Sequence, residues 1–176
     1  MATVTRDGVA GERHFEVRST RDRDLLHAFL NRDRIFAAYA IADTDDREFR
    51  RTRWGVAFDD GAPAAVVLEY RGISPQPLFA MGEPAGVGAI LRHVIRTRIA
   101  YLAAKPEVVP AVRRLYRVES AAPMIRMVVD RASFVPVVGD AVRLDQGDTQ
   151  HLNRLYELGF NAWLPDEAVA GGIYYG

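Results

Sequence analysis

The sequence predicts an α/β (α+β) protein in which helices flank a mixed, mostly antiparallel sheet. One observation is the turn signal Asp59-Asp60-Gly61 between two apolar runs, residues 54–58 and 64–70. This arrangement is typical of a β-hairpin, because an Asp-Gly pair readily adopts positive φ. Further along, short apolar runs alternate with stretches of helical periodicity, which favours partly parallel pairing. The chain has 176 residues and 49% hydrophobic residues, enough for a substantial core.

The first part of the chain predicts a strand and two helices. Residues 1–13 are interpreted as a flexible tail, and residues 14–18 alternate as a short strand does. The sequence Ser19-Thr20-Arg21-Asp22 resembles a capping box, with a hydroxyl residue followed three positions later by an acid. A helix is therefore expected to follow it, and a second from about Asp33.

Beyond the hairpin, a third strand is predicted at residues 78–81, followed by a glycine-rich stretch and a helix. Residues 99–103 predict another strand. Pro106 suits the first turn of the next helix, because proline has no amide hydrogen to lose there. Residues 124–129 are expected to form a closing strand. The expected order is β-α-α-β-β-β-α-β-α-β, which makes residues 14–131 one domain.

The remaining residues predict a linker and an incomplete second unit. Pro136 and Gly139 act as breakers within residues 132–140. From residue 141 the pattern of strand, two helices and strand begins again and runs to residue 176. We therefore expect the chain to be a truncated domain or a gene fragment.

Composition excludes several classes of function. The formal net charge is +0 at pH 7, so no general affinity for nucleic acid is expected. Apolar runs are too short for a membrane span, and the N-terminal residues lack a signal peptide's apolar region. The absence of cysteine removes disulfides and thiolate catalysis, and no histidine pair has metal-ligand spacing, so no metal is expected. A cytoplasmic protein is predicted, and the arginine-rich, lysine-poor composition suggests a bacterium with a GC-rich genome.

Three local sequences, together with the order of elements, resemble the GNAT family of N-acetyltransferases. Residues 83–88 (Glu-Pro-Ala-Gly-Val-Gly) are similar to the family's glycine-rich loop between a strand and a helix. Residues 111–116 (Ala-Val-Arg-Arg-Leu-Tyr) resemble a late helix that carries a tyrosine. Residues 141–148, followed by apolar helical positions, resemble the opening strand and first helix of a GNAT domain. The resemblance spans nearly the whole chain and suggests a divergent first unit followed by the start of a second.

The resemblance implies an acetyl-CoA-dependent N-acyltransferase that acetylates a primary amine on a small molecule or peptide. It implies that the sheet splits open at the glycine-rich loop, with Gly86, Val87 and Gly88 offering amides to the acetyl-CoA pyrophosphate. Tyr116 is then the candidate general acid, and Glu69, on a strand beside the split, the candidate base.

An alternative hypothesis assigns this chain no catalysis of its own. Glu83 stands where the family has glutamine or arginine, and Pro84 removes one amide donor. The first unit is then a GNAT-like scaffold that pairs with a C-terminal GNAT domain, or a module that self-associates as a homo-oligomer.

Overall fold

The computed structural model describes residues 14–136, 138–157, 164–171 and 174–175. The chain divides after Arg126 into two units, Met1–Arg126 and Met127–Gly176. The predicted tail, residues 1–13, lies outside the described residues. We call the described part of the first unit, residues 14–126, the N-terminal unit.

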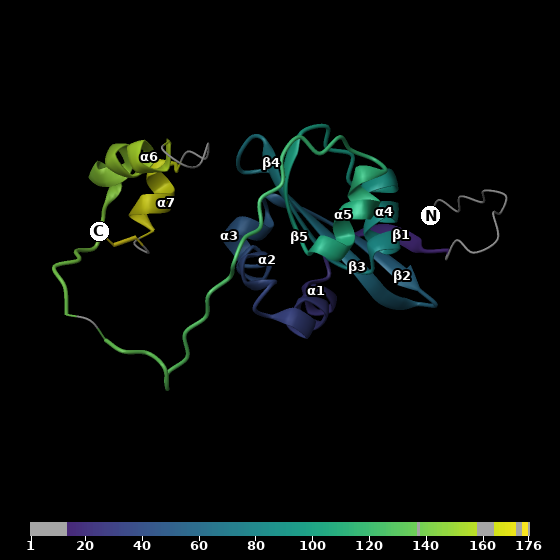
Figure 1. Cartoon of the computed structure of the whole chain (residues 1–176), viewed down its shortest axis with the longest axis horizontal. Helices are drawn as coiled ribbons and strands as arrows, with labels where there is room; N and C mark the ends of the chain where they lie inside the picture. The colour runs from purple at the N-terminus through teal and green to yellow at the C-terminus, as the bar shows by residue number, and fades with distance from the viewer. Residues whose placement is uncertain (1–13, 137, 158–163, 172–173, 176) are drawn as a thin grey trace. The chain divides into compact units, whose positions relative to one another are not determined.

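The N-terminal unit is built on a five-stranded sheet in the order β1-β2-β3-β4-β5 (Figure 1). Neighbouring strands are antiparallel from β1 to β4, whereas β4 and β5 are parallel. The strands are β1 Glu16–Thr20, β2 Thr52–Asp59, β3 Ala62–Tyr70, β4 Gln76–Gly82 and β5 Ala100–Ala104. This topology confirms the predicted mixed, mostly antiparallel sheet with flanking helices.

Helices cover both faces of the sheet (Figure 1). One face packs against α1 Arg23–Leu30 and the short helices α2 Ala38–Ala42 and α3 Asp46–Phe49, with a 3₁₀ turn at Asn31–Asp33. The other face packs against α4 Pro84–His93 and α5 Val109–Arg113, which is preceded by a 3₁₀ turn at Pro106–Val108. The core therefore has two layers, one on each side of the sheet.

The alternation of side chains along β2 shows how the sequence specifies the two layers. Trp54 and Val56 belong to the core on the α1 side, whereas Ala57 belongs to the core on the α4 side. Gly55 also faces α4, since an added Cβ there would collide with Ile90 of that helix. The glycine thus permits α4 to lie close to the sheet.

The predicted hairpin between β2 and β3 is confirmed. Asp59 pairs with Ala62, and the two residues between them have positive φ, 47° at Asp60 and 80° at Gly61. A two-residue loop with positive φ at both positions matches the right-handed twist of the flanking strands.

The start of α1 differs from the prediction. Ser19 and Thr20 belong to β1, where they pair with Gly55 and Trp54. The N-cap is Asp22, whose side chain accepts a hydrogen bond from the Leu25 amide at 3.0 Å. Strand pairing with β2 extends β1 past the hydroxyl residues, so the next suitable acceptor caps the helix.

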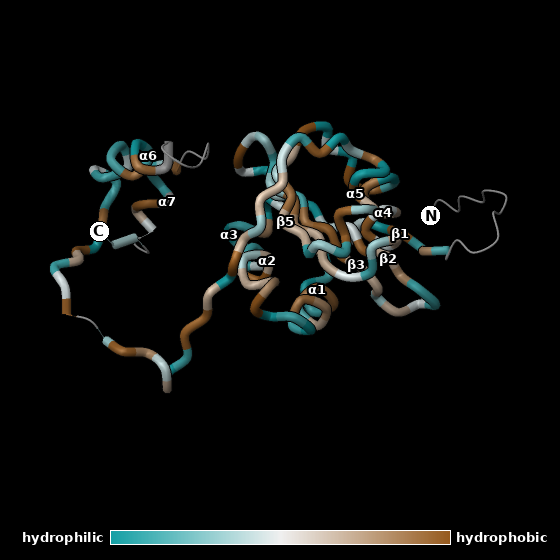
Figure 2. The backbone as a smooth tube through the Cα atoms, in the orientation of Figure 1, coloured by the Kyte–Doolittle hydropathy of each residue, from teal (hydrophilic) through white to brown (hydrophobic). Residues whose placement is uncertain are grey.

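The predicted closing strand at residues 124–129 is not formed. This stretch has no assigned secondary structure, and its large apolar side chains are between 61% and 90% exposed: Met124, Ile125, Met127, Val128 and Val129. In Figure 2 such residues appear as brown segments along the chain after α5. Apolar residues alone do not make a strand, because a strand needs a partner for its backbone groups.

The second unit contains two helices, as the sequence predicts: α6 Thr149–Glu157 and α7 Asp166–Ala170. A capping box joins the side chains and amides of Asp145 and Asp148 ahead of α6. Arg143 and Tyr175 form an isolated antiparallel bridge. Parts of the predicted final strand, residues 172–173 and 176, lie outside the described residues.

Asp43, the C-cap of α2, predicts a pH dependence of stability. Burial, assisted by the nearby Glu48 charge, raises its pKa from 3.8 to about 6. The folded state thus holds a proton more tightly than the unfolded chain, so stability falls as pH rises from 3.8 to about 6. Replacing Asp43 with Asn should remove about 1 kcal/mol of this loss, after allowing for partial solvent exposure.

The measurement is the free energy of unfolding in urea at several pH values across this window, for the unaltered chain and the Asn variant. The variant should be the more stable of the two at neutral pH and nearly equal to the unaltered chain at acidic pH. An unchanged difference at every pH contradicts the assignment to Asp43.

Candidate functional site

The sheet opens at the carboxyl ends of its only described parallel pair. Strands β4 and β5 pair from Gln76 and Ala100 as far as Ala80 and Ala104, and no pairing continues beyond. A cavity of about 160 Å³ lies there, lined by Ala80, Met81, Gly82, Lys105, Glu107 and Val108. Helix α4 begins at Pro84, directly after β4. The carboxyl ends of parallel strands are where open α/β sheets bind ligands, so this is the first place to look for a cofactor.

The glycines predicted to cradle a pyrophosphate lie inside α4. At Gly86, an added Cβ would lie 3.0 Å from the Ala65 Cβ and 3.3 Å from the Ala57 Cβ. Val87 is fully buried in the core on this side of the sheet. At Gly88, an added Cβ would make an ordinary contact, 3.8 Å from the Ala111 Cβ of α5. The absence of a side chain at Gly86 therefore lets α4 pack close to the sheet.

Few amides at this end of α4 remain available to an anion. The Val87 amide donates to the Glu83 carbonyl at 2.9 Å, and the Glu83 amide donates to the Ala64 carbonyl at 2.9 Å. Gly88 is further into the helix, where amides bond to the preceding turn. Pro84 has no amide hydrogen. Of the three predicted donors, only Gly86 has its amide in the turn that lacks intrahelical acceptors.

The charges around the opening are mostly negative. Lys105 lines the cavity, but its ammonium is 2.6 Å from a carboxylate oxygen of Asp33. Their hydrogen bond lowers the pKa of Asp33 and raises that of Lys105, so both are charged at neutral pH. Glu107 also lines the cavity, and Glu83 is the N-cap residue of α4. The Lys105 ammonium is already paired with Asp33, and Glu107 adds a second carboxylate, so the residues here do not fit the phosphates of CoA.

The two predicted catalytic residues meet at the other end of α4. Glu69, on β3, accepts a hydrogen bond from the Thr97 hydroxyl and a charge-assisted one from Arg71 Nε at 2.8 Å. Tyr116 donates its hydroxyl hydrogen to the Thr97 carbonyl at 2.8 Å. Burial, and secondarily the Glu69 charge, raises the pKa of Tyr116, so its phenol stays neutral. Thr97 therefore links Glu69 to Tyr116.

The polar cluster of Glu69, Thr97 and Tyr116 makes its hydrogen bonds within the protein. Glu69 is 7% exposed, and each of its carboxylate oxygens already accepts a hydrogen bond. Tyr116 lies beyond the end of α5, half-buried against the core, rather than on the predicted helix. The ten residues of α4 span about 15 Å, so the cluster and the β4–β5 opening are separate places. Sequence reasoning missed Thr97, because nothing in the Arg-Thr-Arg stretch that contains it signals a bridging role.

The described residues hold neither of two other kinds of site. No group of three histidine, aspartate or glutamate side chains there is placed to hold a metal ion. Among the same residues, none of the helices has the length and apolar character needed to cross a bilayer.

Comparison with known proteins gives matches at the level of structure only. No family model matches the sequence, and no curated protein matches it significantly. One similar solved structure is the ribosomal-protein-alanine N-acetyltransferase from Brucella melitensis biovar Abortus 2308, with 15% identity and a TM-score of 0.38 over 65% of this chain and 100% of that chain. Another is the aminoglycoside N-acetyltransferase AAC(6′)-Iy in complex with CoA, with 16% identity and a TM-score of 0.39 over 70% of this chain and 99% of that chain. Both are N-acetyltransferases, but likeness at this level says nothing about the chemistry of this chain.

Proposed function

We propose that the chain is part of an acetyl-CoA-dependent N-acyltransferase of the GNAT type, and that its N-terminal unit is a non-catalytic scaffold. The order of strands and the crossing of α4 between parallel β4 and β5 support the GNAT assignment, since this is the arrangement that the resemblance implies. The charge at the β4–β5 opening carries the scaffold assignment. There Asp33 and Glu107 outnumber Lys105.

The hydrogen bonds of the polar cluster also support a scaffold. Acetyl transfer to an amine needs a base near the amine and an acid near the departing sulfur. Glu69 already binds Thr97 and Arg71, and Tyr116 already donates to Thr97. We therefore assign these residues to joining β3, the loop after α4 and the end of α5. In this proposal the primary amine and acetyl-CoA bind outside residues 14–126, in a GNAT-like domain that begins near residue 141.

The experiment that tests this proposal is an isothermal titration of acetyl-CoA into the 176-residue chain. We expect no saturable binding with a dissociation constant below about 1 mM. Exchanging Glu83 for Gln and Pro84 for Ala together removes one negative charge and restores one amide, so this double variant should bind acetyl-CoA more tightly than the unaltered chain.

The variant Gly88→Glu is the matched control, because it adds a carboxylate in the first turns of the same helix. If the unaltered chain binds acetyl-CoA with micromolar affinity and Gly88→Glu weakens that binding, the N-terminal unit holds the cofactor. The scaffold assignment is then wrong, and Gly86 and Tyr116 return as candidates for the roles predicted from the sequence.

A further inference from the structure

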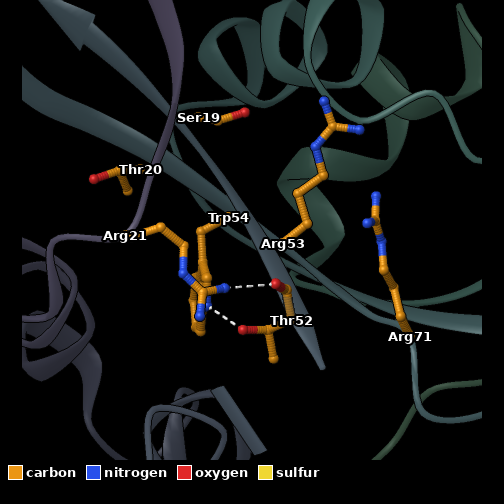
Figure 3. Close-up of a pocket in the computed structure, with 7 residues that line it drawn as sticks. All are labelled: Ser19, Thr20, Arg21, Thr52, Arg53, Trp54 and Arg71. Carbon is orange, nitrogen blue, oxygen red and sulfur yellow. Dashed lines mark hydrogen bonds between the residues drawn. The ribbon is translucent and has the colours of Figure 1, made fainter. Parts of the chain in front are cut away.

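A cleft in the N-terminal unit lies where β1 ends and β2 begins (Figure 3). Its volume is about 410 Å³, within the range of small-molecule sites of roughly 300–1,000 Å³. Three arginines and three hydroxyl residues line it around Trp54: Arg21, Arg53, Arg71, Ser19, Thr20 and Thr52. No acidic side chain is among these lining residues.

Two of the arginines point the same way, one from β2 and one from the residue that follows β3. Arg53, on β2, is paired with Glu69 on β3, and Arg71 follows Glu69 by two residues. Arg53 and Glu69 therefore project from the α4 face of the sheet, as does Ser19, which pairs with Gly55. Arg71 lies on the same face, because its Nε donates to Glu69 at 2.8 Å. Figure 3 shows Arg53 and Arg71 extending in the same direction.

The third arginine, Arg21, interacts with the wall of the cleft. In Figure 3, Arg21 turns away from the other two, and its Nη1 donates to the Thr52 carbonyl at 2.9 Å. Its guanidinium also lies over the Phe49 ring, 3.9 Å from the centroid. Arg21 is thus part of the wall of the cleft rather than a free donor.

The charges of Arg53 and Arg71 are not balanced locally. Arg71 uses Nε to bind Glu69, which leaves its two terminal nitrogens without a partner in that pair. The Arg53 side chain makes no hydrogen bond or ion pair with the residues that the structure describes. Two guanidinium groups with one carboxylate between them leave a net positive charge, which an anion in the cleft would neutralise.

We propose that this cleft binds the oxyanion of a small molecule, a carboxylate or a phosphate, between Arg53 and Arg71. The planar guanidinium fork matches both oxyanions in bidentate geometry, and the Ser19 hydroxyl offers a further donor. The site goes beyond the proposed function, because neither acetyl-CoA nor catalysis is needed for it. It lies near Glu69, at the opposite end of α4 from the β4–β5 opening.

The test is a nuclear magnetic resonance titration of the ¹⁵N-labelled 176-residue chain at constant ionic strength. Sodium acetate and inorganic phosphate are the two probes, and sodium chloride is the reference. We expect saturable shifts of the Ser19, Arg53 and Arg71 signals with one probe or both. Saturation with acetate alone assigns a carboxylate, with phosphate alone a phosphate, and with both an oxyanion site of either kind. Shifts no larger than those with chloride overturn the proposal.

The variant Arg53→Gln should weaken the binding of the effective probe by about tenfold or more, because a charge-assisted hydrogen bond is lost. Arg34→Gln is the matched control, since Arg34 is an exposed arginine outside the cleft. Equal weakening by both variants would show a general charge effect and would overturn the site.

A third variant separates binding from folding. Arg53→Lys keeps the charge but loses the planar fork, so it should fold and bind the probe several-fold less tightly than the unaltered chain. If it instead binds as tightly, the bidentate site is wrong. Acetyl-CoA titration of the same variants keeps the two proposals distinct, because oxyanion binding in the cleft does not depend on whether the chain binds acetyl-CoA.

Discussion

Replacing Trp54 with alanine is expected to destabilise the N-terminal unit by about 3–5 kcal/mol. In a marginally stable domain, this loss is enough to leave most molecules unfolded. Trp54 is 0% exposed in the middle of β2, and its ring is 6.4 Å from that of Phe49 between centroids. Its indole Nε1 also donates to the Thr52 hydroxyl at 2.8 Å. The substitution removes the largest side chain of the core on the α1 side and leaves a cavity that the sheet cannot close.

Urea denaturation followed by circular dichroism measures this effect. Ile99→Ala is the control, because Ile99 is 72% exposed and its truncation should change the free energy of unfolding by less than about 0.5 kcal/mol. The lower bound expected for Trp54→Ala is about 3 kcal/mol. If the free energy of unfolding falls by less than about 1.5 kcal/mol, half of that bound, the core repacks around the gap.

The second large effect is expected at Gly82, the last residue of β4. Its φ of +106° is a conformation that side chains rarely adopt. An added Cβ would collide with the Ala64 carbonyl oxygen and would lie 2.7 Å from the Ala65 Cα, both backbone atoms of the neighbouring strand. Backbone strain and overpacking together predict a loss of about 3 kcal/mol or more for Gly82→Ala.

Gly61→Ala separates the two causes. Gly61 also has a positive φ, +80°, but nothing lies within 4 Å of an added Cβ. Only the strain remains there, and a loss of about 1 kcal/mol is expected. Thermal unfolding of both variants gives the comparison. If the two alanine variants lose the same stability, the predicted collision with β3 at Gly82 is wrong.

The features that could be predicted from the sequence are those that neighbouring residues specify. The β2–β3 hairpin was predictable because Asp60 and Gly61 allow the turn and apolar runs flank it. The N-cap of α1 was not, because the extent of β1 depends on pairing with Trp54, far along the chain. The strand expected at residues 124–129 failed for a similar reason: its apolar composition was visible, but the absence of a partner was not.

The candidate site likewise has features that the sequence predicts and features that only the fold determines. The Gly86 region was recognisable as a strand-to-helix junction, but whether its amides were free depended on the start of α4. Glu69 and Tyr116 are linked through Thr97, whose hydroxyl binds Glu69 and whose backbone carbonyl binds Tyr116. Every residue has a backbone carbonyl, so the sequence does not indicate which one Tyr116 binds. The alignment of Arg53 with Arg71 follows from the register of β2 and β3, which only the folded sheet determines.

The position of Lys105 has a practical consequence for labelling. It is the only lysine in the sequence, so an amine-reactive fluorophore has one side-chain target in the chain, at the edge of the β4–β5 opening. The ion pair with Asp33 keeps that amine protonated, and a protonated amine does not react. The labelling rate at fixed pH therefore falls as the fraction of chains with this ion pair closed rises, and it offers a one-site probe of separation between the 3₁₀ turn after α1 and the end of β5.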